Sequence, residues 1–216
     1  MARNTERDAR EAKRRKQQLC EAGLRLFSTR GIEGVSLQEV AIAADVGVAT
    51  LFKYYQNKTN LLISISANLW DGVWKNTLDK LPEEELMQKN AYELVSLYAD
   101  IIINLYRERP EVLCFSSNYK TYIRRDGTSS EQLKEHLEVL DPLAKLFHIK
   151  YEEAKQNHCI RTDIPEKQLF STVALTMLAM AERYAQGIVW ADDNSSNYMP
   201  ELLNVKEMLL LWIKQS

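Results

Sequence analysis

Residues that break helices are scarce in this chain, and their positions constrain the fold more than any other feature. The 216 residues include only 7 Gly and 5 Pro, whereas a protein of strands and tight turns needs such residues about every ten positions. Between the breaks, apolar residues recur at the i, i+3, i+4 spacing of a helix with one buried face. The first such stretch contains Leu19, Ala22, Leu26 and Phe27, and Gly31 ends it. These patterns predict an all-α protein.

Proline positions predict where the later helices begin, because proline fits the first turn of a helix and not its interior. Pro82 lies in an acidic turn, after which a helix is expected. Pro165 should start a long helix that reaches about residue 190. Two further helices begin at Pro110 and Pro200, and another contains Pro142, where it should kink or break. With the N-terminal segments, the chain is predicted to form about nine helices and no strand.

Charge is unevenly distributed along the chain. Residues 1–60 carry 11 Lys and Arg against 7 Asp and Glu, residues 61–216 carry 17 against 23, and the total is −2. A basic end on an acidic body is expected where one end meets a polyanion such as DNA. The first 16 residues are almost all polar. We interpret them as a flexible or frayed arm that grows into a helix and that either solubilises the chain or contacts DNA.

Cysteine usage and hydropathy favour a reduced, cytoplasmic compartment. Cys20, Cys114 and Cys159 are far apart and form no CxxC pair. The charged N-terminus is unlike a signal peptide. The longest uncharged run, residues 169–181, is too short and too rich in Ser and Thr to cross a bilayer. No membrane partner is therefore expected.

The sequence contains no motif that nominates an enzyme or a cofactor site. It lacks the GxGxxG, Walker, GxSxG and HExxH patterns. His136, His148 and His158 lack metal-ligand spacing with one another or with the cysteines. No catalytic residue, cofactor or metal site is predicted.

Two short amphipathic segments follow the first helix. Residues 36–39, Ser-Leu-Gln-Glu, fit a capping box, in which the Ser36 hydroxyl accepts from the Glu39 amide and the Glu39 carboxylate reaches back. Gly47 is an acceptable N-cap for a second helix over residues 48–54. Two short helices separated by a tight turn are typical of a helix-turn-helix. The second helix of this motif enters the major groove of DNA.

Candidate DNA contacts come from both short helices and from the turn after them. Leu51 and Tyr55 should anchor the second helix, which leaves its other side exposed. Lys53 would read a guanine or clamp a phosphate, and Lys58 is expected to meet the DNA backbone. The predicted DNA-binding residues are Ser36, Gln38, Gly47, Val48, Ala49, Thr50, Lys53, Tyr54 and Lys58. Val48 could instead pack inward, and Gln38 could simply face solvent.

Residues 37–61, LQEVAIAADVGVATLFKYYQNKTNL, resemble the DNA-binding domain of the TetR (tetracycline repressor) family. Leu26, Phe27 and Gly31 fit that family's first helix, so the resemblance covers about residues 14–64. Three positions depart from the family pattern: Gly47 where Ser is frequent, Phe52 where Tyr is frequent, and Lys53 where a second aromatic residue is common. These departures mean that an operator sequence cannot be transferred from the family.

The resemblance implies a ligand-binding and dimerising domain after the DNA-binding domain. The predicted division is 1–60 for the helix-turn-helix domain with its basic arm and 61–216 for the helical remainder. The helix from Pro165 is apolar on two sides, which requires burial on both. We therefore predict a homodimer joined by a two-fold four-helix interface of this helix and the last one, with Glu182 paired across it. The predicted interface residues are Leu175, Leu178, Glu182, Val189, Leu209 and Trp212.

Large, adaptable side chains in the same region are candidates for a ligand pocket. The predicted ligand-binding residues are Trp70, Trp74, Tyr98, Phe115, Tyr119, Tyr122, Met177, Met180 and Tyr184. Such residues line apolar pockets, and they also fill cores. A bound effector of mostly apolar character would favour a state whose recognition helices no longer match the spacing of successive major grooves.

Two functions from different classes follow from these observations. The leading hypothesis is a ligand-responsive repressor that binds double-stranded DNA at a palindromic operator and is released by a small-molecule effector. The alternative is a helical small-molecule binding or adaptor protein without DNA binding. The basic arm and Lys53 favour the first hypothesis.

Overall fold

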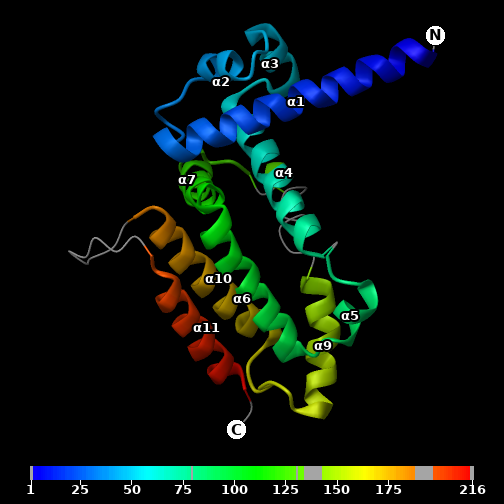
Figure 1. Ribbon diagram of the computed structural model, residues 1–216, viewed down its shortest axis with the longest axis vertical. Helices are drawn as coiled ribbons and strands as arrows, with labels where there is room; N and C mark the ends of the chain where they lie inside the picture. The colour runs from blue at the N-terminus through cyan, green and yellow to red at the C-terminus, as the bar shows by residue number, and fades with distance from the viewer. Residues whose placement is uncertain (1, 79, 130, 134–142, 188–196, 215–216) are drawn as a thin grey trace. The chain divides into compact units, whose positions relative to one another are not determined.

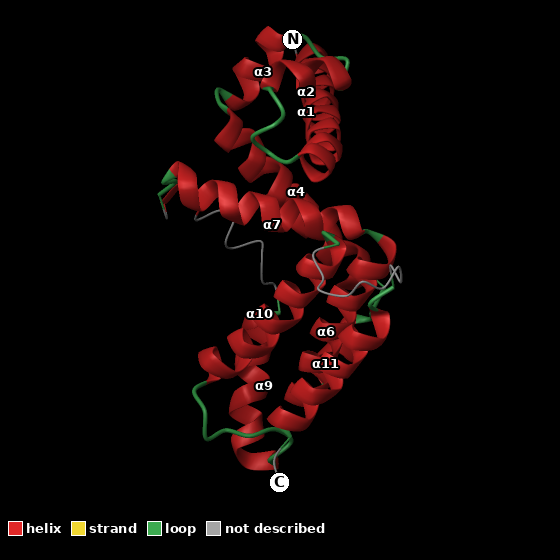
Figure 2. Ribbon diagram, turned by 90° about the vertical axis from the view of Figure 1, so that its left-hand side faces the viewer, coloured by secondary structure: helices red, strands yellow, loops and turns green. Residues whose placement is uncertain are grey.

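The computed structural model describes residues 2–78, 80–129, 131–133, 143–187 and 197–214. Within these residues the chain forms ten α-helices and no strand, which confirms the predicted all-α class (Figure 2). The first five helices are α1 (Ala2–Arg30), α2 (Leu37–Ala43), α3 (Val48–Tyr55), α4 (Lys58–Leu78) and α5 (Glu83–Gln88). The others are α6 (Ala91–Glu108), α7 (Pro110–Asp126), α9 (Ala144–Asn157), α10 (Glu166–Ala185) and α11 (Met199–Ile213).

The helices are organised in two compact units. The first contains residues 1–71 and 114–140, and the second contains residues 72–113 and 141–216. The predicted domain boundary at residue 60 therefore falls inside the first unit. The later segment joins this unit through contacts far apart in sequence: Thr59 Oγ1 donates to Asp126 Oδ2 at 2.8 Å, for example.

In the first unit, α1 packs on α2, and α2 packs on α3 (Figure 1). The apolar stripes predicted from the sequence form its core, where Leu19, Phe27, Val40, Leu51 and Leu61 have no measurable exposure. Each buried side chain of this size stabilises the folded protein by roughly 1.5–3 kcal/mol relative to leaving it exposed. The helix-turn-helix, formed by α2 and α3, is thus held by packing against α1 and the start of α4.

The N-terminal arm is helical from Ala2, which corrects only the prediction that its start is flexible or frayed. α1 is continuous from Ala2 to Arg30, and it ends where Gly31 adopts φ +73°. Glu11 pairs with Arg14 and Arg15 at 3.7 and 2.6 Å, across one turn of the helix. Such i, i+3 and i, i+4 pairs, together with Arg and Lys as good helix formers, support a polar helix.

In the second unit, α6 packs against α10, α11 and α9 (Figures 1 and 2). Its core contains Leu94 of α6, Phe147 of α9, Leu169 of α10 and Ile213 of α11, all buried. Phe147 also contacts Phe170, with ring centroids 4.8 Å apart. Long-range aromatic and aliphatic packing therefore places these helices.

Several predicted boundaries in this unit differ from the observed ones. The acidic turn at Pro82 contains the short helix α5. α10 ends at Ala185, before the predicted limit near residue 190, because Gly187 takes φ +69°. α9 begins at Ala144, two residues after the proline at which the sequence predicts a kink or break. Pro142 and residues 188–196 lie outside the described residues.

Candidate DNA-contact surface

Ser36 begins the helix-turn-helix by capping α2. Its Oγ accepts from the Glu39 amide at 3.2 Å, and the Ser36 amide donates to Glu39 Oε2 at 2.8 Å. Arg30, at the end of α1, pairs with the same carboxylate at 2.8 Å. The hydrogen bonds from Ser36, with the guanidinium of Arg30, lower the pKa of Glu39 to about 2. The predicted capping box is present, and it links the end of α1 to the start of α2.

The turn between α2 and α3 depends on backbone geometry. The Val46 amide donates to the Ala41 carbonyl at 3.0 Å, and Asp45 occupies the left-handed region at φ 52°. Gly47 is the N-cap of α3, as predicted, and its carbonyl accepts from the Thr50 amide at 2.9 Å. A glycine supplies no side-chain cap, so the turn and the packing below it define the start of α3.

α3 has one buried and one outward side. Leu51 and Tyr55 are buried, as predicted. The exposed residues are Ala49, Phe52 and Lys53, and the half-buried ones are Val48, Thr50 and Tyr54. Phe52 was not among the predicted contacts, although 45% of it is exposed. The i, i+3 spacing from Ala49 was the signal that could have selected it.

Tyr55 anchors α3 to α1. Its hydroxyl lies 3.4 Å from Cys20 Sγ and donates to the Lys16 carbonyl at 3.4 Å. Burial, reinforced by the neighbouring Cys20, raises the pKa of Tyr55. Asn68 of α4 also donates to Cys20 Sγ, at 3.4 Å. This small polar cluster joins α1, α3 and α4 beneath the recognition helix.

Lys58 has a structural partner within the same unit. Its Nζ donates to the Ile32 carbonyl at 3.0 Å, and burial lowers its pKa, against the opposing charges of Glu33 and Glu39. The side chain thus holds the connection between α1 and α2. An ammonium has three donors, so Lys58 can hold Ile32 and still donate to DNA. Its contact with DNA remains a prediction.

The helical arm carries exposed basic side chains, and one of them lies against α3. Lys16 Nζ lies 5.5 Å from the centre of the Tyr54 ring. Arg7, Arg10 and Lys13 are exposed along the same helix. Their three-residue spacing was the sequence signal for a helix with a basic face.

The nine predicted DNA-binding residues all lie in the first unit, on α2, the turn, α3 and the start of α4. Ser36, Gln38, Gly47, Ala49 and Lys53 are exposed, and Val48, Thr50, Tyr54 and Lys58 are half-buried. Their contact with DNA remains a prediction.

Residues 19–65 match the family model described as bacterial regulatory proteins, tetR family. Over these residues the chain is similar to the TetR family. The matched residues begin within α1 and include α2, α3 and the first turns of α4, the same elements that build this surface.

Curated transcriptional regulators match part of the chain. The probable HTH-type transcriptional regulator YttP of Bacillus subtilis (strain 168) is 28% identical over 94 residues, 44% of this chain and 45% of that protein. The HTH-type transcriptional repressor KstR of Rhodococcus jostii (strain RHA1) is 38% identical over 61 residues, 28% of this chain and 29% of that protein. The chain thus matches less than half the length of each relative.

Solved structures of transcriptional regulators share the fold over most of the chain. The regulator FadR from Bacillus subtilis, solved in complex with stearoyl-CoA, superposes with a TM-score of 0.68 at 16% identity, covering 91% of this chain and 98% of that one. A TetR regulator from Marinobacter aquaeolei VT8 gives 0.67 at 18% identity, covering 96% and 100%. These similarities extend the TetR fold to the C-terminal helices.

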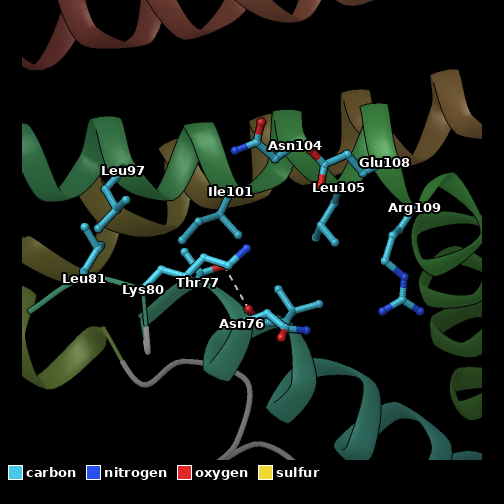
Figure 3. A pocket seen from close by; sticks show the side chains of 11 residues that line it. Asn76, Thr77, Lys80, Leu81, Leu97, Ile101, Asn104, Leu105, Glu108 and Arg109 are labelled. Atoms are coloured by element: carbon cyan, nitrogen blue, oxygen red, sulfur yellow. Dashed lines mark hydrogen bonds between the residues drawn. The ribbon is translucent and has the colours of Figure 1, made fainter.

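A groove of about 580 Å³ lies between α4 and α6 in the second unit (Figure 3). Leu97, Ile101 and Leu105 point into it from α6. Its other lining residues are Val73, Asn76, Thr77, Lys80, Leu81, Asn104, Glu108 and Arg109. Its volume is within the usual range for small-molecule sites.

None of the nine predicted ligand-binding residues lines this groove. Those in the first unit are Trp70, Phe115, Tyr119 and Tyr122, and those in the second are Trp74, Tyr98, Met177, Met180 and Tyr184. Trp74 packs on Tyr98 with ring centroids 6.1 Å apart, and Phe115 stacks on Tyr119 at 5.9 Å. In the described structure these rings fill cores, and a role for them in ligand binding remains a prediction.

The predicted dimer residues differ in exposure. Leu175 of α10 is 63% exposed, whereas Leu178 and Glu182 are buried within the chain. Leu209 and Trp212 of α11 are half-buried, and Val189 lies outside the described residues. Three further apolar residues of α11 are exposed: Leu203, Met208 and Leu211. No described helix is long and apolar enough to cross a membrane.

Proposed function

We propose that this protein is a dimeric, ligand-responsive transcriptional repressor of the TetR type that binds a palindromic DNA operator. Residues 1–60 would supply the DNA-binding domain with its basic arm, and residues 61–216 the ligand-binding and dimerising part. The protein would act in the cytoplasm, where operator DNA is found.

The outward side of α3 is the observation that carries this proposal. Leu51 and Tyr55 hold the helix from below, and Ala49 and Lys53 remain exposed above. The small side chains near the start of the helix leave room for base edges, and the Lys53 ammonium can reach a guanine or a phosphate. The basic face of α1 adds cations that favour phosphate contact.

Exposed apolar residues on α10 and α11 support the dimer. Leu175 and Leu211 are 63% and 65% exposed, and the two helices pack side by side (Figure 1). Two copies of this pair can bury the four exposed apolar side chains of each chain in a four-helix arrangement. A two-fold dimer would also present two copies of α3 to successive major grooves.

The groove between α4 and α6 is the proposed effector site. Its aliphatic wall suits an apolar ligand, and Lys80 and Arg109 suit a ligand with an acidic end. α4 begins three residues after α3 ends, and its later turns line the groove. A ligand that displaces these turns would act on the helix that follows the recognition helix directly.

DNA binding is tested with fragments recovered from genomic DNA by the purified full chain. Lys53→Ala should weaken binding to a recovered fragment by roughly tenfold, since a good base or phosphate contact contributes about 1–3 kcal/mol. Lys167→Ala removes the same charge from an exposed site on α10 and should leave affinity unchanged. Lys58→Ala is a poorer probe, because it also breaks the bond to Ile32. If the wild-type protein recovers no fragment above random duplex, the adaptor function replaces this proposal.

Dimerisation is tested by sedimentation of Leu175→Glu and Leu211→Glu. Each should shift the protein towards a monomer of unchanged helix content and weaken operator binding. Met87→Glu is the matched control, because Met87 is an exposed apolar residue on α5. A dimer that survives both changes contradicts the proposed interface.

Effector binding is tested by tryptophan fluorescence with dodecanoate and stearoyl-CoA as probes. Asn104→Trp places a large ring in the groove and should block the response to these probes while DNA binding persists. An unchanged response in this variant would place the effector elsewhere, for example among the predicted aromatic residues.

A further inference from the structure

A histidine and two glutamates converge on one surface of the second unit. His148 and Glu152 stand one turn apart on α9, and Glu166 is the first residue of α10. One ligand atom from each lies within 4.8 Å of the other two. From this cluster we propose a binding site for a divalent transition-metal ion, a function that nothing in the DNA-binding role requires.

The backbone that carries these three side chains is held firmly. Phe147 and Tyr151, on either side of His148, are buried in the core, and so is Leu169, one turn into α10. The Tyr151 hydroxyl donates to the Ile164 carbonyl at 2.5 Å, which fixes the loop just before Glu166. A site on rigid elements loses little conformational freedom when it binds an ion.

The spacing of the three groups suits a small cation. His148 Nδ1 and Glu166 Oε2 form a hydrogen bond of 2.7 Å, which a bound ion would replace. Two ligands at about 2.1 Å from one ion are separated by roughly 3.0–3.4 Å in octahedral or tetrahedral geometry. Small rotations of the exposed side chains of His148 and Glu152 would therefore admit the ion, and water would complete its coordination.

The donor set selects the class of ion. An imidazole nitrogen favours zinc, nickel, cobalt or iron over magnesium and calcium, which prefer oxygen ligands alone. Two carboxylates supply the charge that offsets a dication. Because Glu166 follows a separate loop, 18 residues after His148, a search for histidine and cysteine spacing in the sequence did not find the site.

Lys155 competes for one of the ligands. Its ammonium lies 2.6 and 2.8 Å from the two carboxylate oxygens of Glu152. An ion must share that carboxylate or displace the ammonium, and the positive charge opposes a second cation nearby. This contact makes a specific prediction: removal of Lys155 should strengthen metal binding.

The test is a calorimetric titration of the full chain with Zn²⁺, in a Cys159→Ser background that removes the thiol next to His158. We expect one ion per chain with micromolar affinity. His148→Ala and Glu166→Gln should each weaken binding by about tenfold or more. Lys155→Met should tighten it, and His158→Asn, at an exposed histidine one residue beyond α9, should leave it unchanged.

Cobalt supplies a second, spectroscopic readout. Co²⁺ held in a four- or five-coordinate site by one imidazole and two carboxylates should show visible ligand-field bands stronger than those of aqueous Co²⁺, without the near-ultraviolet charge transfer of a thiolate ligand. This excess absorbance should be lost in His148→Ala and when EDTA removes the ion from the protein. Zn²⁺ binding that is only millimolar, that survives His148→Ala, or that is lost with His158→Asn would overturn the proposal.

Discussion

The two units of this protein contain the same kind of element but place it by different means. In the first, α2 and α3 have seven and eight residues, and helices this short are unstable alone in water. Caps and turns at Ser36 and Gly47 determine where they start. In the second, α6, α10 and α11 have 18, 20 and 15 residues, and packing between distant side chains places them. Local capping and turn signals therefore determine where the short helices of the first unit begin.

One device occurs in both units and makes the comparison direct. α6 begins with a second capping box, in which the Asn90 amide donates to Glu93 Oε2 at 2.8 Å and the Glu93 amide donates to Asn90 Oδ1 at 3.0 Å. The geometry resembles that of Ser36 and Glu39. α6, however, has ten buried residues, whereas α2 has two. The same cap should matter less where packing already holds the helix.

The largest expected effect comes from the packed unit. Phe147→Ala should destabilise the protein by about 3–5 kcal/mol, because it removes a fully buried ring and leaves a cavity beside Phe170. Urea unfolding followed by circular dichroism measures this loss. Ile149→Ala, two residues away and half exposed, is the matched control and should cost far less. Equal losses would mean that this core does not place the helices.

The next effect separates the two capping boxes. Ser36→Ala and Asn90→Ala should each cost about 1 kcal/mol of stability. DNA affinity should fall only in Ser36→Ala, since α2 depends on its cap and supports α3 through the turn at Val46. Urea unfolding and fluorescence anisotropy with an operator fragment test both parts. A similar loss of DNA affinity in Asn90→Ala would break the distinction between the units.

The stability of the protein at acidic pH should depend on the first capping box, formed by Ser36 and Glu39. The folded structure holds the pKa of Glu39 at about 2, below its ordinary value of 4.5. The ionised Glu39 side chain therefore contributes its full stabilisation above pH 4.5, the ordinary pKa, and this contribution is lost as the pH falls through about 2. As the pH falls from 4.5 to about 2, the free energy of unfolding should decrease less in Glu39→Gln than in the wild type. A titration of the Glu39 side chain by NMR with a midpoint near 4.5 would contradict the ion pair and cap.

The smallest effect concerns the start of the recognition helix. Gly47→Ser should stabilise the protein by a few tenths of a kcal/mol, because serine adds a side-chain cap to α3. An added Cβ meets only Thr50 Oγ1, at 3.7 Å, which is ordinary contact. Thermal unfolding measures the gain. A loss of stability would show that the turn at Gly47 cannot accept a side chain.

The helix-turn-helix could be predicted almost residue by residue because its signals are local. The cap at Ser36, the N-cap at Gly47, and the buried pair Leu51 and Tyr55 each depend on neighbours within a few positions. The partner of Lys58 was not predictable in this way, because the carbonyl of Ile32 lies 26 residues earlier. The arm was predicted to grow into a helix, but not to be helical from Ala2 onwards.

Sequence alone was enough to establish helix as the dominant element, the positions of the main breaks, and the family of the DNA-binding region. Those properties follow from periodicity, backbone preferences and short-range hydrogen bonds. Only the tertiary structure decided that aliphatic residues of α4 and α6 line a groove, that Trp74, Tyr98 and Phe115 lie in cores, and that His148 meets Glu166. Amphipathic helices of similar composition can pack in many ways, and the choice among them depends on contacts between residues distant along the chain.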